Sequence, residues 1–463
     1  MIRSFYNIAW FLRIAWVLAR HKALFLLENT NVAPVLTFLL RIVSASSPDR
    51  PGERLATALE KLGPTFIKLG QALSTRADLV GDEVAQDLAR LQDKLPNFPY
   101  EVALAIIKEE FDRPVDELFQ SIDPQPVAAA SIAQVHQAVT IEGKKVAIKL
   151  LRPGIENIFA RDIQLFLWLA KLIEKRVPYS RRLKPVEVIN IFAQTVRMEM
   201  DLRFEAAAAS ELKENCIHDK GFYVPEIDWQ RTSKRVLTLE WVDGIPIIDK
   251  EALTAAGHDL EKIARQLAVS FFNQAYRDGF FHADMHPGNL FVNSNGDIVV
   301  IDFGIMGRLD KQTRLYVAEI LHGFLIRDYR KVAKVHFDAG YVPKHQSIDN
   351  FAQACRSIGE PIIGLPVAQI SIARLLMQLF KITEDFEMET QPQLLLLQKT
   401  MMLVEGVGSV LDPNVNMWKL AEPWIEAWAV RNLGPEAKLI NAAKAFVSAL
   451  ADLPEILQRL GKN

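Results

Sequence analysis

The hydrophobic positions along the chain follow two different periods. Two short apolar runs, 290–292 and 298–301, flank Asn295-Gly296, a dipeptide typical of tight hairpin turns. Between 260 and 279, apolar residues instead recur every three or four positions, which predicts a long helix. The helical period also dominates 314–460. This mixture predicts an α+β fold, with a mainly helical C-terminal part.

Composition narrows the possible functions. The chain has 463 residues, enough for two or three domains, and half of them are hydrophobic, a share that points toward contact with a membrane surface. The 54 basic residues nearly balance the 56 acidic ones, which gives no electrostatic case for binding nucleic acid. Cys216 and Cys355 are the two cysteines, so neither a disulfide framework nor a zinc site is predicted, and a reducing compartment fits.

The N-terminal segment 1–27 has an amphipathic pattern. It lacks acidic residues, contains Trp10 and Trp16, and places Arg13 and Arg20 on one helical face. The opposite apolar stripe is expected to include Ile8, Phe11, Leu12, Ala15 and Leu18. Because charges interrupt the apolar run, the pattern predicts a helix lying in the bilayer interface rather than crossing it. The same pattern fits a helix packed on the protein's own core, and the sequence leaves both interpretations open.

Two motifs on either side of the predicted hairpin carry the candidate chemistry. His282-x-Asp284, with Asn289 five residues later, has the H-x-D-x-x-x-x-N spacing of a kinase catalytic loop, and a D-F-G motif begins at Asp302. In phosphoryl transfer from ATP, Asn289 and Asp302 would supply oxygen ligands to Mg²⁺. Asp284 would orient or deprotonate the attacking hydroxyl or water. The two motifs at this spacing predict a kinase-like active site, in which His282 is expected to position the loop.

A nucleotide-binding segment is expected upstream. The stretch 146–149 reads as a strand ending in Lys149, which would contact the α- and β-phosphates and pair with a helical glutamate. About one hairpin earlier, 127–135 matches a glycine-rich phosphate loop in which alanine replaces each glycine. Alanine disfavours the positive φ angles open to glycine, so a stiffer loop is expected. The expected cradle residues are Val127, Ala128, Ala129, Ala130, Ser131, Ile132, Ala133, Gln134 and Val135.

Two further segments complete the expected nucleotide site. A strand within 236–245 is expected to lead into a hinge that binds adenine, and the hinge residues are Glu240, Trp241 and Val242. The strongly helical run 196–211 should supply the acid that pairs with Lys149. Its candidate acids are Glu199, Asp201 and Glu205.

A functional role for Lys68 and Gln71 is indicated only by a family resemblance. Lys68 and Gln71 lie on one side of a predicted helix, where pattern alone fits a solvated surface. However, Lys68-x-Gly70-Gln71, followed by Ser74, Arg76, Asp78-Leu79 and Leu91-Gln92-Asp93, resembles the KxGQ element of the UbiB/AarF (ADCK-type) family of atypical kinases. The alanine-rich loop matches the same family. The likeness extends over about residues 50–430 and is closest to the bacterial UbiB members.

The resemblance implies a two-lobed protein-kinase-like fold with a helical N-terminal KxGQ extension and a helical C-terminal tail. It implies that Lys68 and Gln71 are inhibitory or gating residues. It also assigns Glu205 to the ion pair with Lys149, and Glu199 and Asp201 to contact with Lys68, although the sequence leaves an exchange of these roles open. The expected domains are a membrane-associating region at 1–50, the KxGQ extension at 51–125, an N-lobe at 126–245 and a C-lobe with its tail at 246–463.

The function implied by resemblance is that of an ATP- and Mg²⁺-dependent atypical kinase or ATPase that assists ubiquinone biosynthesis. Its expected partners are membrane lipids, prenylated quinone precursors and other proteins of that pathway, at the cytoplasmic side of the bacterial inner membrane. Family members commonly end in two transmembrane helices, but charges interrupt 439–461, so peripheral attachment is expected. Alternatives are a small-molecule or lipid phosphotransferase and a non-catalytic, nucleotide-sensing lipid-binding scaffold. A protein kinase is disfavoured because no Ala-Pro-Glu follows the D-F-G motif.

Overall fold

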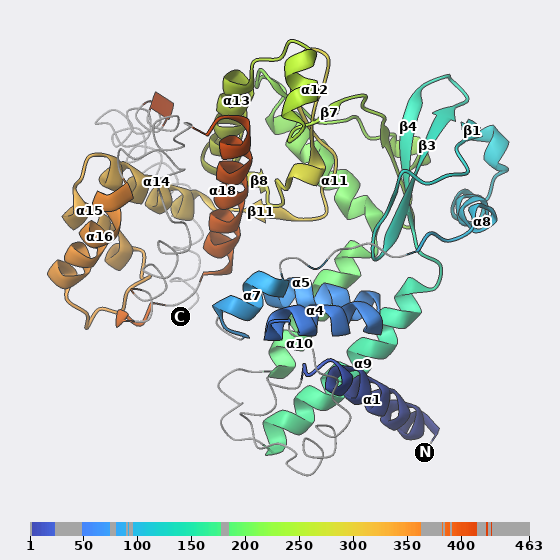
Figure 1. The fold of residues 1–463 in the computed structure, drawn as a ribbon, viewed down its shortest axis with the longest axis horizontal. Helices are drawn as coiled ribbons and strands as arrows, with labels where there is room; N and C mark the ends of the chain where they lie inside the picture. Colours follow the sequence, from blue (N-terminus) through green and yellow to red (C-terminus); the bar gives the residue numbers. More distant parts are fainter. Residues whose placement is uncertain are drawn as a thin grey trace, which may run out of the picture. The chain divides into compact units, whose positions relative to one another are not determined.

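A computed structural model describes most of the chain as two compact units. The described residues are 2–23, 49–74, 80–88, 91, 96–176, 185–362, 382, 385–388, 391–413, 423–424 and 427. Unit 1 comprises Met1–Glu211 and Pro225–Trp241, and unit 2 comprises Leu212–Val224 and Val242–Asn463. Figure 1 shows a mixed helix and sheet fold, as the sequence predicts, and each unit is described by itself below.

Unit 1 is built on an antiparallel sheet. The strand order is β1 (Phe119–Ile122), β3 (Ala133–Thr140), β4 (Lys145–Leu151) and β6 (Val236–Glu240), and the short β2 (Ala128–Ala129) pairs with β3. One face packs on helix α8 (Tyr100–Phe111), and the core there includes Ile106, Ile107, Ile148 and Leu150. The alternation of buried and less buried residues along β4 leaves Lys149 on the opposite face.

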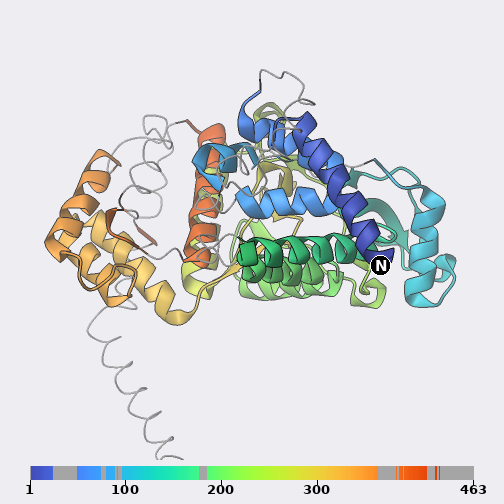
Figure 2. The same cartoon turned by 90° about the horizontal axis from the view of Figure 1, so that it is seen from below.

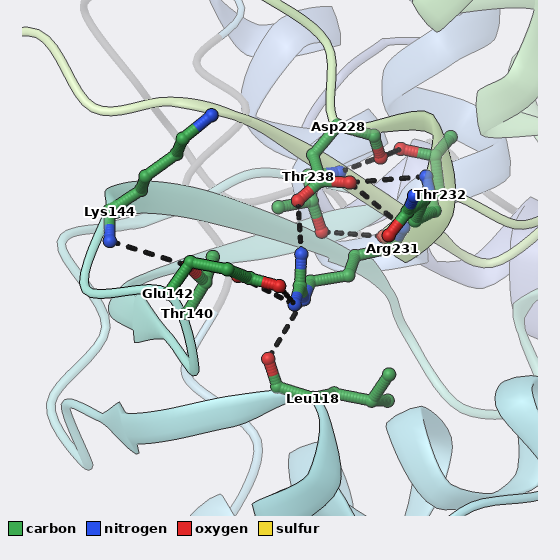
Figure 3. A network of polar contacts seen from close by, with 9 residues as sticks. Leu118, Thr140, Glu142, Lys144, Asp228, Arg231, Thr232 and Thr238 are labelled. Atoms are coloured by element: carbon green, nitrogen blue, oxygen red, sulfur yellow. Dashed lines mark hydrogen bonds and ion pairs between the residues drawn. The ribbon is translucent and has the colours of Figure 1, made fainter.

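A buried arginine holds several loops of this sheet together. In Figure 3 the Arg231 guanidinium donates to both carboxylate oxygens of Glu142, at 2.7 and 2.8 Å, and to Asp228 at 2.7 Å. It also donates to the Leu118 carbonyl, just before β1, at 2.8 Å. The Thr238 hydroxyl donates to the Arg231 carbonyl at 2.6 Å. Arg231 therefore joins the start of β1, the β3–β4 turn and the segment before β6.

Helices make up the rest of unit 1. They are α1 (Ile2–Arg20), α4 (Pro51–Leu62), α5 (Pro64–Ser74), α7 (Asp82–Leu88), α9 (Ile155–Arg176), α10 (Pro185–Glu199) and the first part of α11 (Leu202–Asn215), with short 3₁₀ turns at Val115–Glu117 and Trp229–Arg231. Helices α4, α5 and α7 pack on one another, and α5 also contacts α9 and α10. Leu55, Leu59 and Leu62 lie on the buried face of α4, as their spacing predicts.

The N-terminal helix α1 packs on the protein's own core. It lies against α4, as Figures 1 and 2 show, and buries Ile14, Ala15, Val17 and Ala19. The predicted apolar stripe was wrong about Leu12, because this side chain is 54% exposed. Leu12 lies on the same exposed side as Arg13, Trp16 and Arg20. Ala15 of the predicted stripe is buried and Leu18 is partly buried, whereas the side chains of Ile8 and Phe11 lie outside the described part of the chain.

The helical run 196–211 is divided in two. Helix α10 ends at Glu199 and α11 begins at Leu202. Asp201 caps α11, because its carboxylate accepts the backbone N–H of Arg203 at 3.2 Å. The N–H of Leu202 donates to the Lys234 carbonyl at 2.9 Å, which fixes the break to the strand region of the same unit.

Unit 2 contains two small sheets surrounded by helices. The larger sheet has the order β5 (Phe222–Tyr223), β10 (Ile298–Val300), β9 (Leu290–Val292) and β7 (Ile245–Pro246), and β8 (Phe280–His282) pairs with β11 (Met306–Arg308). The helices are α12 (Lys250–Ala255), α13 (Leu260–Phe272), α14 (Lys311–Leu325), α15 (Tyr329–Asp338), α16 (Ile348–Ile362) and α18 (Pro392–Leu411). The β9–β10 hairpin is confirmed, and Gly296 in its turn has φ +81°.

Three details of unit 2 differ from or add to expectation. The helix expected over 260–279 changes at Asn273 into a π-helical segment, Asn273–Asp278, which ends at Gly279. After the D-F-G motif, β11 precedes the next helix and pairs with β8. By length and composition, 393–411 in α18 is apolar enough to cross a membrane, although core helices pass the same test.

Residues 24–27 and 439–461 lie outside the described residues.

Candidate functional site

The first group of site residues lies in unit 1, around Lys149. Strand β4 presents Lys149 and helix α11 presents Glu205, and the Nζ and Oε1 atoms are 2.7 Å apart. The side chains are 16% and 9% exposed, so the pair is largely, but not completely, shielded from water. Such a short, partly desolvated contact fixes the direction of the ammonium group. A lysine held in this way can present its charge to a phosphate oxygen.

The alanine-rich segment forms the β2–β3 hairpin. The N–H of Ala130 donates to the Ala133 carbonyl at 2.8 Å, and Arg152 Nε donates to the Ala130 carbonyl at 3.0 Å. None of its alanines has a positive φ, which agrees with the steric limit that alanine imposes. The hydroxyl of Ser131 is buried and has no hydrogen-bond partner among the described residues. The loop therefore contains a buried hydroxyl whose hydrogen-bonding capacity is not used by the described residues.

The second half of the same segment is buried and helps to hold the fold together. Ser131 to Gln134 are buried, whereas Val127 and Ala128 are exposed. The Gln134 carboxamide accepts the Phe98 N–H at 2.9 Å and donates to the Phe98 carbonyl at 3.2 Å. Side-chain contacts to a nucleotide would therefore come from the exposed 127–130 end, while Gln134 anchors the chain that leads into α8.

The expected hinge follows β6. The Glu240 carboxylate accepts the N–H of Glu226 at 3.1 Å, and the Trp241 N–H donates to the Lys145 carbonyl at 3.1 Å. The chain passes from unit 1 to unit 2 after Trp241, so Val242 belongs to the other unit. Adenine binding by these three residues stays a prediction.

The KxGQ residues lie on α5, also in unit 1. Lys68 Nζ is 3.1 Å from Glu199 Oε2 at the end of α10. Asp201 instead receives two hydrogen bonds from the Arg203 guanidinium, at 2.8 and 2.7 Å, which hold the pKa of its carboxyl below the usual range. Gln71 is half-buried, and its carbonyl accepts the Ser74 hydroxyl at 2.7 Å. Thus the acids Glu199 and Glu205 have separate lysine partners.

The glycine of this motif has a packing reason. A Cβ atom added at Gly70 would lie 2.3 Å from a methyl carbon of Leu91 and 2.8 Å from one of Leu59. Gly70 therefore allows α5 to pack closely on α4 and on the chain after α7.

The second group of site residues lies in unit 2, on the loop after β8. His282 is buried, and its Nε2 donates to the Asp302 carbonyl, while its Nδ1 accepts the Asp284 N–H at 3.3 Å. Burial lowers the pKa of His282, consistent with a neutral ring whose single proton is on Nε2. The Gln274 carboxamide oxygen accepts the His282 N–H at 3.0 Å. His282 thus joins the catalytic loop to the D-F-G motif, as its expected positioning role requires.

Asn289 and Asp302 are brought together by the hairpin. The Ile301 N–H donates to the Asn289 carbonyl at 3.2 Å, so Asn289 lies beside the residue preceding Asp302. Asn289 Nδ2 donates to the Asp284 carbonyl at 3.1 Å and to Asp284 Oδ2 at 3.3 Å. Asp302 Oδ1 accepts the Gly304 N–H at 2.9 Å. Asp284 and Asn289 are therefore hydrogen-bonded to each other, and Asp302 directly follows the residue that pairs with the Asn289 backbone.

A hard cation fits the chemistry of this group. With Nδ2 of Asn289 donating to Asp284, the amide oxygen is the ligand atom that Asn289 would offer, and Asp302 would offer carboxylate oxygen. The described residues hold no cluster of three or more histidine, cysteine or acidic side chains of the kind that binds a metal without a substrate. This donor set fits Mg²⁺ that arrives with nucleotide phosphates and completes its coordination with them.

A lysine that belongs to none of the predicted motifs also reaches this loop. Lys399 Nζ, on α18, is 3.5 Å from Asp284 Oδ1. The neighbouring Thr400 hydroxyl is 3.2 Å from the Ala283 carbonyl. No local sequence pattern predicts this contact, because the two residues are 115 positions apart in the chain.

The sheet carrying Lys149 and the loop carrying Asp284 define a kinase-like protein, and comparisons with known proteins agree. Residues 90–336 match the ABC1 atypical kinase-like domain, and residues 355–416 match the UbiB helical domain. A solved structure, described as the complex of Rv3197 with erythromycin from Mycobacterium tuberculosis, shares the fold with a TM-score of 0.56 at 24% identity. That likeness covers 80% of this chain and 94% of the other.

Curated relatives extend the likeness over nearly the whole chain. A "Probable protein kinase UbiB" of Marinobacter nauticus is 42% identical over 96% of this chain and 83% of its own length. A relative of the same name in Pseudomonas paraeruginosa is 39% identical over 96% and 85%. The chain belongs to the UbiB family of ABC1 atypical kinase-like proteins. Its kinase-like fold follows from this membership, as the resemblance implied.

Proposed function

We propose that this protein transfers the γ-phosphoryl group of ATP, with water as the acceptor, in the service of ubiquinone biosynthesis. The observation that carries the proposal is the short Lys149–Glu205 ion pair, because a lysine clamped on a sheet beside an alanine-rich hairpin suits a polyphosphate. The hydrogen-bonded Asp284 and Asn289, with Asp302 next to the residue that pairs with Asn289, support it from unit 2. Both groups fall within the one kinase-like domain match.

The proposed reaction uses few protein groups. A water oxygen attacks the γ-phosphorus, the bond from that phosphorus to the β–γ bridging oxygen breaks, and its electron pair leaves with ADP. Asp284 orients the water and accepts its proton. Lys149 neutralises phosphate charge, and Asn289 and Asp302 would hold Mg²⁺. When bound, that ion would offset the charge on the phosphate oxygens.

The proposed biological setting is a membrane surface on which prenylated quinone precursors are handled. The exposed side of α1 supports this setting, since Leu12 and Trp16 are 54% and 46% exposed next to Arg13 and Arg20. Apolar and aromatic side chains flanked by arginines suit an anionic lipid interface. Peripheral attachment at the cytoplasmic side of the inner membrane is part of the proposal, as are partner proteins of the same pathway.

The test is phosphate release from Mg-ATP by the purified protein, with and without anionic liposomes that carry a prenylphenol. Asp302→Asn is the matched variant, because its amide oxygen can still accept the Gly304 N–H while the carboxylate charge is lost. We expect turnover that rises with the lipid and falls at least about 100-fold in the variant. Nucleotide binding without turnover under every condition would favour the scaffold, and a phosphorylated prenylphenol would favour the lipid phosphotransferase.

A further inference from the structure

Lys399 comes from outside the kinase-like part of the chain. It lies on α18, within the UbiB helical domain match at 355–416, whereas Asp284 lies within the match at 90–336. The Nζ to Oδ1 distance is 3.5 Å, and both residues belong to unit 2. The contact therefore joins two parts of the chain that the family models describe separately.

The position of Lys399 is fixed by the next residue. Thr400 is fully buried, and its hydroxyl oxygen lies 2.8 Å from the Leu396 carbonyl of its own helix and 3.2 Å from the Ala283 carbonyl of the loop. Two consecutive residues of α18 thus contact two consecutive residues of the catalytic loop. Helix α18 also packs on α13 and β11, which flank the loop in the sequence, and Figure 1 shows α18 beside α13. This packing sets the register in which Lys399 meets Asp284.

The two carboxylate oxygens of Asp284 have different neighbours. Oδ2 accepts from Asn289, and Oδ1 lies toward Lys399. The segment 282–289 contains no lysine or arginine of its own, so α18 supplies a cation that the loop sequence lacks. A carboxylate that approaches the γ-phosphate of ATP suffers repulsion from the phosphate charges, and a nearby ammonium reduces it.

The Lys399–Asp284 ion pair contributes little to the stability of the folded protein. The Lys399 and Asp284 side chains are 38% and 32% exposed, and ion pairs at such exposure contribute about 0–1 kcal/mol. The same exposure leaves both groups accessible to a substrate. The position of an accessible lysine beside a catalytic carboxylate is therefore better explained by a role in the reaction than by a contribution to folding stability.

We propose that Lys399 is a positioning residue for Asp284 in phosphoryl transfer. It holds Oδ1, while Asn289 holds Oδ2, so that the carboxylate faces the attacking oxygen, and its charge offsets the repulsion between Asp284 and the γ-phosphate. This inference rests on the proposed phosphoryl-transfer function. It gives the UbiB helical domain a direct part in the chemistry of the kinase-like domain.

The test is a double-mutant cycle in the full-length protein with Lys399→Met, Asp284→Asn and their combination. Phosphate release from Mg-ATP gives kcat, and a fluorescent ATP analogue gives the nucleotide Kd. We expect Lys399→Met to lower kcat at least about tenfold with little change in Kd, because the residue acts on the acceptor side. In the Asp284→Asn background the same change should have no further effect. Lys399→Arg should restore part of the activity.

Two controls separate this role from general damage. Lys334→Met removes an exposed lysine on α15 of the same unit and should leave kcat unchanged. Thermal melting of Lys399→Met checks the fold, and partial rescue by arginine remains informative if melting shifts. Full turnover in Lys399→Met, or an equal loss in both backgrounds, would contradict the role of Lys399 alone. A wild-type protein that binds the analogue without turnover would contradict the proposed function and, with it, this inference.

Discussion

Lys149 and Glu205 form an ion pair of 2.7 Å that links strand β4 to helix α11. Two acids earlier on the same helical run were also candidates, but Glu199 pairs with Lys68 and Asp201 pairs with Arg203. Each acid therefore has its own basic partner. The arrangement separates a pair suited to nucleotide binding from a pair that joins the KxGQ helix to α10.

The nucleotide pair leads to a binding prediction. Lys149→Met and Glu205→Gln should each weaken ATP binding by about 10- to 100-fold, the equivalent of a hydrogen bond to a charged group. Loss of Glu205 acts by releasing the lysine, so the double variant should be little worse than Lys149→Met. Titration with a fluorescent ATP analogue measures this. Lys144→Met, an exposed lysine in the β3–β4 turn, is the matched control. Unchanged affinity in both single variants would remove Lys149 from the site.

The Lys68–Glu199 pair leads to a prediction about gating. If this contact holds the KxGQ helix in an inhibitory position, Lys68→Met and Glu199→Gln should each raise phosphate release by about two- to fivefold. The size follows from a half-buried ion pair, and the two changes should not add, because each breaks the same contact. The charge swap Lys68→Glu with Glu199→Lys should return turnover toward the wild-type value. Reduced turnover in both single variants would instead make the pair part of the productive state.

The Arg231 network leads to a pH prediction. Hydrogen bonds from Arg231 lower the pKa of Glu142 from 4.5 to about 2, and Thr140 adds to the effect. Because the folded pKa lies below the unfolded one, the pair stabilises the protein fully above about pH 4.5 and loses this contribution as the pH falls toward 2. Glu142→Gln should lower the urea midpoint at pH 5.5, and its difference from wild type should shrink at pH 3.5. A constant difference at both pH values would show that ionisation of Glu142 is not involved.

A glycine beside the catalytic loop leads to a stability prediction. A Cβ atom added at Gly307 would lie 2.1 Å from the ring of Phe281, which is fully buried and directly opposite in the β8–β11 pair. Gly307→Ala should therefore cost about 1–3 kcal/mol through overpacking. Gly406→Ala on α18 is the contrasting control, since nothing lies within 4 Å of its added Cβ. That change should be neutral or stabilising by up to about 1 kcal/mol. Urea unfolding of both variants measures the difference.

The sequence by itself determined the features that depend on neighbouring residues. The spacing from His282 to Asn289, the D-F-G motif and the turn at Gly296 predicted a hairpin between two parts of one catalytic group, and the backbone contact of Ile301 with Asn289 has this form. The sequence also predicted the apolar face of α4 and the strand that carries Lys149. Such features follow from local periodicity and turn chemistry, which short stretches of chain contain in full.

Tertiary structure alone decided the contacts between distant segments. It divided 196–211 at the Asp201 cap and left Leu12 exposed, and it paired Glu205 with Lys149 as the family resemblance had implied. It also brought Lys399 to Asp284 across 115 residues. These outcomes depend on how helix faces fit together and on which charges remain accessible. Residue spacing along the chain does not contain that information, because side-chain packing over long separations sets it.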